Sequence, residues 1–85
     1  MDTFVEMETT ERRIKLIWEF HGPDSRLTAQ HHAKHLKEYG VTNNVTNHMT
    51  GVGMIETGYI AYIIVNESEM IGVRDALIPQ RGELA

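Results

Sequence analysis

The chain contains no cysteine, and this absence excludes several kinds of chemistry at once. Disulfide bonds, thiolate nucleophiles and zinc sites with sulfur ligands all require the missing thiol. Small domains of oxidising compartments commonly rely on disulfides. The composition therefore predicts a cytoplasmic protein.

Long hydrophobic runs and an excess of basic charge are missing as well. The longest apolar run, Tyr59 to Val65, is far shorter than the roughly 20 residues that span a bilayer. The acidic stretch Met1 to Glu6 is unlike a signal or transit peptide. Eight basic and twelve acidic side chains give a net charge of −4 with histidine neutral, whereas a phosphate backbone attracts basic surfaces. We expect neither a membrane nor a nucleic acid as a partner.

The first half of the chain carries a strand pattern followed by a helix pattern. Apolar residues alternate with polar ones from Arg13 to Phe20, which predicts a half-buried strand. Gly22 to Ser25 break this strand and supply the cap of a helix. The helix is expected to run to Tyr39, with Gly40 as its left-handed terminal residue.

The second half predicts two strands and a helix. We expect a strand from Val41 to Ile55, with a bulge at its paired glycines, and a second strand from Tyr59 to Val65. The turn between them is placed at Glu56 to Gly58, Thr50 to Gly53 being the alternative. A second helix follows and ends at Pro79.

These elements predict an α+β fold in the order β-α-β-β-α, within one domain of residues 1–85. The order resembles a ferredoxin-like two-layer sandwich, an antiparallel sheet with two helices on one face, but it is one strand short. Residues 1–11 are expected to be either a short extra strand that fills this place or a flexible arm. Residues 80–85 are expected to be a flexible tail.

The strand from Tyr59 to Val65 is apolar on both faces, although two helices can cover only one face of a single sheet. Ile17 breaks the polar face of the first strand in the same way. We therefore expect self-association through the uncovered face, a half-exposed face in the monomer being the alternative. The predicted interface residues are Ile17, Ile60, Tyr62 and Ile64.

Three of the five histidines stand together as His31-His32-Ala33-Lys34-His35. His31 and His35 are one helical turn apart, a spacing that can hold a divalent metal ion, and Glu38 could add a carboxylate. The alternative is an ordinary solvated helix face. His32 falls on the flank of the buried face, where burial as the neutral ring would depress its pKa.

A second candidate site lies where the first strand meets the first helix. His21, Asp24 and Ser25 are neighbours in the sequence, at a helix N-terminus whose dipole disfavours the imidazolium form of histidine. They are predicted to form a small-molecule or anion site.

Nucleophilic catalysis has little support, because both serines, Ser25 and Ser68, fall at expected helix caps. We expect no cofactor and a binding, regulatory or scaffolding module that acts as a homodimer, with an unidentified protein or small molecule as a further partner. The alternative is a small dimeric enzyme or metal-binding protein that uses His21, His31 and His35.

Overall fold

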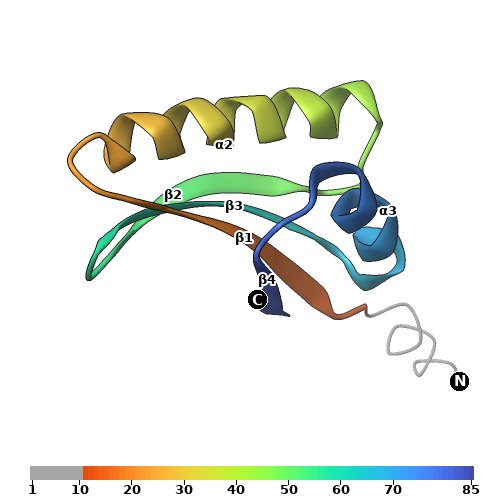
Figure 1. Ribbon diagram of the computed structural model, residues 1–85. Helices are drawn as coiled ribbons and strands as arrows, with labels where there is room; N and C mark the ends of the chain where they lie inside the picture. The colour runs from red at the N-terminus through yellow and green to blue at the C-terminus, as the bar shows by residue number, and fades with distance from the viewer. Residues whose placement is uncertain (1–10) are drawn as a thin grey trace, which may run out of the picture.

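The computed structural model describes residues 11–85. It is an α+β fold in which a four-stranded antiparallel sheet of order β2-β3-β1-β4 carries two helices (Figure 1). The chain order is β-α-β-β-α-β. The elements are β1 (Arg13–His21), α2 (Ser25–Thr42), β2 (Met49–Ile55), β3 (Gly58–Asn66), α3 (Glu67–Leu77) and β4 (Arg81–Leu84).

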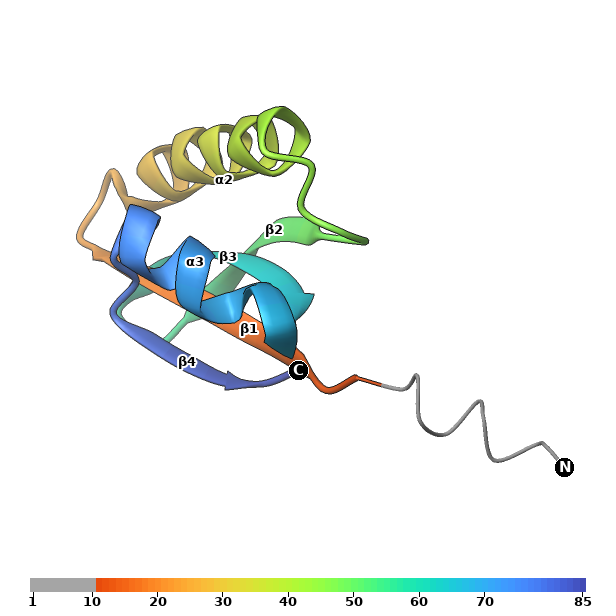
Figure 2. The same cartoon turned by 90° about the vertical axis from the view of Figure 1, so that its right-hand side faces the viewer.

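Both helices lie on one side of the sheet, so that the core is a single layer between them and the strands (Figure 2). The alternate residues Ile14, Leu16 and Trp18 of β1 point into this layer, where they meet Leu36 of α2 and Val73 of α3. The Trp18 Nε1 group donates a hydrogen bond of 3.2 Å to the carbonyl oxygen of Leu77. The period-2 pattern of β1 thus predicted correctly which of its residues face the helices.

The fourth strand comes from the C-terminal end, where the sequence predicted a flexible tail. Residues 81–84 pair with β1 from Ile17↔Arg81 to Ile14↔Leu84, and the backbone N–H of Gln80 donates to the carbonyl of Ile17. This edge strand has no apolar alternation to reveal it, since backbone hydrogen bonds rather than buried side chains hold it. The prediction that residues 1–11 supply the missing strand falls almost entirely outside the described residues.

Gly40 does not end α2, contrary to the prediction. It lies inside the helix, which continues to Thr42. The missing side chain makes room for the His48 imidazole, because a Cβ atom at position 40 would lie 2.5 Å from two atoms of that ring. The glycine therefore serves packing between α2 and the following loop.

The predicted strand from Val41 begins only at Met49, because the intervening segment contains turns in which Asn44 and Asn47 adopt positive φ. The expected bulge at Gly51 and Gly53 is absent from the β2–β3 ladder, whose register is continuous. The predicted position of the hairpin turn is confirmed: Glu56 and Thr57 connect β2 to β3.

No helix within residues 11–85 is long and apolar enough to cross a membrane.

The left-handed backbone of Ile78, the residue after α3, is expected to reduce the stability of the protein. It has φ 51°, is 71% exposed and has a β-branched side chain. Left-handed conformation costs an L-residue about 1–2 kcal/mol, whereas glycine adopts it freely at the expense of more unfolded-state entropy. We expect Ile78→Gly to raise the free energy of unfolding by about 0.5–1 kcal/mol, measured by urea denaturation.

Ile71→Gly is the matched control, since Ile71 is exposed inside α3 and has ordinary helical geometry. This variant should lose about 1 kcal/mol. A loss of stability in Ile78→Gly as well would contradict the expected relief of strain.

Candidate functional site

The side of the sheet that faces away from α2 and α3 is the first candidate site. We call it the open face. Its members, assigned from strand register, are Lys15, Ile17 and Glu19 of β1, Met49, Gly51 and Gly53 of β2, Ile60, Tyr62 and Ile64 of β3, and Arg81 and Glu83 of β4. All four residues predicted for the interface therefore lie on one side of the sheet.

These four residues differ in how much surface they offer. Ile17 is 0% exposed and Ile60 is 7% exposed, whereas Tyr62 and Ile64 are half-buried. Ile17 is enclosed by its neighbours in the sheet, with Tyr62 and Arg81 opposite it in the register. Sequence analysis missed Met49, which is 60% exposed and becomes a neighbour of Ile64 only once the β2–β3 register is known.

Tyr62 lies across the middle of the open face. Gly51 leaves space for it, because a Cβ atom at that position would collide with the phenol oxygen. The Lys15 Nζ atom is 4.4 Å from the centroid of the ring, within the range of a cation–π interaction. Gly53 leaves room for Ile60 less strictly, because a Cβ atom at that position would lie 3.2 Å from the Ile60 side chain.

A charged rim runs along the β1–β4 side of the open face. The carboxylate of Glu19 pairs with the guanidinium of Arg81, and its other oxygen lies 3.5 Å from the Nε2 atom of His21. The side-chain oxygen of Gln80 accepts a hydrogen bond from the backbone N–H of Glu19. Glu19 therefore connects the start of β4 to β1.

The structure does not bring His21, Asp24 and Ser25 together through hydrogen bonds in the described chain. The His21 Nδ1 atom is 2.8 Å from the Thr57 hydroxyl of the β2–β3 turn. Asp24 is the N-cap residue of α2 but makes no side-chain cap hydrogen bond. Ser25 is only 4% exposed. Neighbouring positions in the sequence diverge here because β1 ends and α2 begins between them.

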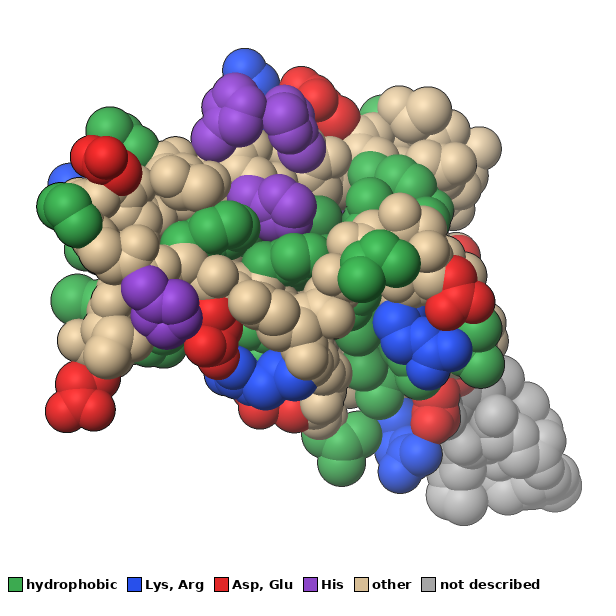
Figure 3. All heavy atoms as spheres, viewed as in Figure 1, with side chains coloured by type: hydrophobic (Ala, Val, Ile, Leu, Met, Phe, Trp, Pro, Cys, Tyr) green, Lys and Arg blue, Asp and Glu red, His purple; other side chains and the backbone are tan. Residues whose placement is uncertain are grey.

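Histidine side chains gather over α2 (Figure 3). His31 and His35 are exposed, and their ring centroids are 4.4 Å apart at an interplanar angle of 68°. The two rings are therefore neighbours on the helix surface, as a spacing of one turn implies. Glu38 does not complete a metal site, since residues 11–85 contain no group of three or more His, Cys, Asp or Glu side chains that could hold an ion.

His32 has a different environment from the other two histidines of the cluster. Its ring packs against Trp18 at 4.9 Å and Phe20 at 5.5 Å between centroids. Its Nε2 atom is buried without a hydrogen-bond partner in the described structure. Burial lowers the pKa of His32, and the positive charges of His35 and His31 lower it further. Folding therefore favours the neutral form of this ring.

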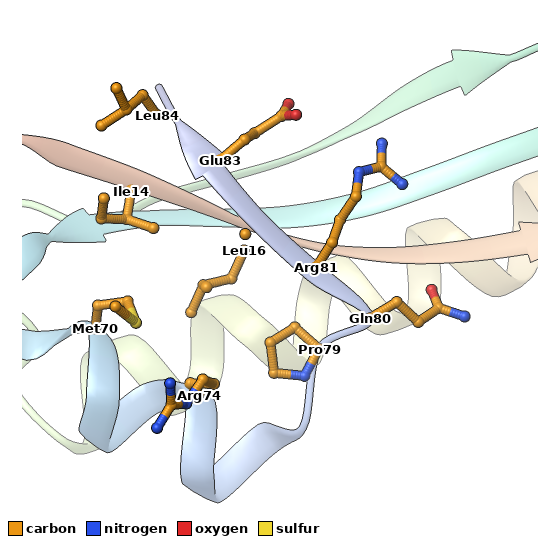
Figure 4. A pocket seen from close by; sticks show the side chains of 10 residues that line it. Ile14, Leu16, Met70, Arg74, Pro79, Gln80, Arg81, Glu83 and Leu84 are labelled. Atoms are coloured by element: carbon orange, nitrogen blue, oxygen red, sulfur yellow. The ribbon is translucent and has the colours of Figure 1, made fainter.

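A groove of about 390 Å³ between α3 and β4 is a site that sequence analysis did not find. Ile14, Leu16 and Met70 give it an apolar lining, and Arg74 from α3 adds a guanidinium (Figure 4). The groove could not be predicted from the sequence, because one of its walls is β4 and residues 80–85 were expected to be a flexible tail.

Comparison of the chain with protein-family models, curated proteins and solved structures finds no match.

The environment of His32 gives a prediction about pH. Its pKa is lower in the folded protein than in the unfolded chain, so between these two values the unfolded state binds more protons. The stabilisation is complete above the unfolded pKa of about 6.5 and is lost as the pH falls below it. We expect the free energy of unfolding to fall between pH 7 and pH 5, measured by urea denaturation.

The matched variant His32→Phe keeps an aromatic ring beside Trp18 and removes the titrating group. Its free energy of unfolding should depend less on pH, with a difference in slope of at most about 1.4 kcal/mol per pH unit. Equal slopes in the two proteins would show that other groups account for the pH dependence.

Proposed function

We propose that this protein is a small cytoplasmic binding or scaffolding module with a ferredoxin-like fold, which acts as a homodimer through its open face. The observation that carries the proposal is the adjacency of Met49, Tyr62 and Ile64 on a sheet surface that neither α2 nor α3 covers. Sheet faces that carry apolar side chains are commonly buried against another layer. The chain order and the two helices on one face support the ferredoxin-like assignment.

The charges around the apolar centre favour a second copy as the partner. Lys15 and Arg81 stand beside Glu19 and Glu83 on the same face, so acidic and basic groups are balanced. In a two-fold dimer the same patch occurs on both partners and must complement itself. A patch with both signs of charge meets this condition, whereas a patch of one sign would repel its copy.

The proposed dimer can be tested by placing a charge on the open face. Ile64→Glu places a carboxylate among the apolar residues, beside Lys15 in the register, where the monomer can accommodate it. Because a dimer would have to bury this charge, we expect the dimer dissociation constant to rise at least about tenfold. Analytical ultracentrifugation over a concentration series measures it.

Ile71→Glu is the control, since Ile71 is 56% exposed on α3, away from the open face. It should assemble as the wild type does. A wild-type chain that stays monomeric at several hundred micromolar would overturn the proposal.

A second candidate, a metal-dependent protein or small enzyme, rests on the close approach of His31 and His35. Two imidazoles alone give a weak site, since physiological metal sites usually have more ligands and supporting hydrogen bonds. We expect zinc to shift the amide signals of this part of α2 only weakly in an NMR titration, without saturation at micromolar metal. His31→Ala/His35→Ala should abolish these shifts and leave the oligomeric state unchanged.

Saturable binding of zinc at micromolar concentration, with shifts at a third residue remote from α2, would favour the metal-dependent alternative instead.

A further inference from the structure

β2 is an edge strand whose outer backbone groups can be identified from the hairpin geometry. The two residues that flank a two-residue turn, here Ile55 and Gly58, form a hydrogen-bonded pair, and such pairs alternate along the ladder. The odd-numbered residues of β2 therefore bond to β3. The N–H and C=O groups of Thr50, Val52 and Met54 point to the outer edge, with which no strand of residues 11–85 pairs.

Nothing in the sequence of β2 protects this edge. Edge strands are usually kept from pairing by charged side chains, prolines, bulges or short length. The seven residues of β2 include no charge and no proline, and their pairing with β3 has no bulge. The opposite edge strand, β4, has only four residues and carries Arg81 and Glu83. The two edges of the sheet thus differ in their capacity to accept another strand.

The side of α2 next to this edge is basic. His32, on one flank of the helix, packs against β1, so the opposite flank lies towards β2, which α2 also contacts. At 100° per residue this flank carries Arg26, Gln30 and Lys37, and all three are exposed. Lys34, one position further from the sheet, lines a shallow hollow of about 430 Å³ together with Lys37. The hollow is also lined by Glu38 and Val41. Glu38 lies further round the helix than Lys34 at 100° per residue, so the charged side chains nearest to β2 are basic.

We propose that the β2 edge binds an extended acidic segment of a partner protein by strand addition. The backbone of the segment pairs with Thr50, Val52 and Met54, which gives affinity without reading sequence. Because side chains alternate across a strand, every second residue of the bound segment faces the basic flank of α2. Acidic residues at those positions are attracted to Arg26 and Lys37.

The other side chains of the bound segment lie beside Gly51, Gly53 and the exposed Met49. This surface is uncharged and therefore suits apolar groups. The preferred segment therefore alternates acidic and apolar residues. A second copy of β2 is expected to bind less well, because two-fold pairing of the edges would bring the basic flanks of two α2 helices towards each other and their charges would repel. The site is centred on the backbone edge of β2 and shares only Met49, Gly51 and Gly53 with the open face, so it extends the proposed function to a heterologous partner.

The test uses the full chain and a fluorescein-labelled, end-blocked octapeptide of alternating glutamate and valine, with binding followed by fluorescence anisotropy. We expect saturable binding that weakens as salt is added, since the ionic part of the attraction is screened. NMR amide shifts should centre on residues 50–54 and on the Arg26–Lys37 flank. The same peptide with lysine in place of glutamate should bind at least about tenfold more weakly.

Two variants separate the backbone and charge contributions. Val52→Pro removes an N–H group that points to the free edge and leaves the bonds to β3 in place, so it should weaken binding at least about tenfold. Lys37→Glu reverses one charge of the flank and should weaken it about three- to tenfold. Arg74→Glu makes the same change on α3 and should bind as the wild type does.

Circular dichroism establishes that each variant is folded, and if Val52→Pro is not, Lys37→Glu against Arg74→Glu decides. Equal binding of the acidic and basic peptides, or equal loss in both charge variants, would overturn the proposal. Amide shifts centred on β4 or on Lys15, Ile17 and Glu19 of β1, rather than on β2, would overturn it as well. So would an absence of binding at millimolar peptide. Each of these results can occur whether or not the protein is a dimer, so failure here is distinguishable from failure of the proposed function.

Discussion

The antiparallel pairing of β1 with β3 is the interaction on which the other elements depend. It runs without interruption from Arg13↔Asn66 to His21↔Gly58 and forms the centre of the sheet. At its end Gly58 lies so close to the backbone of Phe20 that a Cβ atom would collide with the carbonyl oxygen. This register places one set of side chains under both helices and the other set on the open face. The register of β1 with β3 therefore determines both the core and the candidate interface.

The strands and helices with strong apolar periodicity could be predicted from the sequence, and those held by backbone contacts could not. β1 alternates apolar and polar residues, and β3 is a run of apolar residues, so both strands and the face to which each of their side chains belongs could be predicted. All four residues of β4 are exposed, and the strand is held mainly by its hydrogen bonds to β1, which the hydropathy of the sequence does not show. Gly40 was misassigned for a related reason, since its role depends on His48, a residue of the next loop that only the fold brings near.

The candidate site shows the same division. That Ile60, Tyr62 and Ile64 share a face follows from alternation along one strand, and the His31–His35 pair follows from helical spacing. Sequence spacing cannot show that His21 contacts Thr57 rather than the start of α2, because this contact joins the end of β1 to the β2–β3 turn. The histidine cluster also divides into an exposed pair and a half-buried ring whose pKa is lowered, a distinction set by the position of α2 over β1.

Trp18 is the only tryptophan in the chain, and its indole stands where the two helices meet the sheet. Its ring contacts His32 of α2, and its N–H group bonds to the last residue of α3. Protonation of a neighbouring imidazole and loss of a hydrogen bond both alter indole emission. The protein thus carries a built-in fluorophore at the junction of its helices, which reports on the docking of α3 and the charge of His32 without any added label.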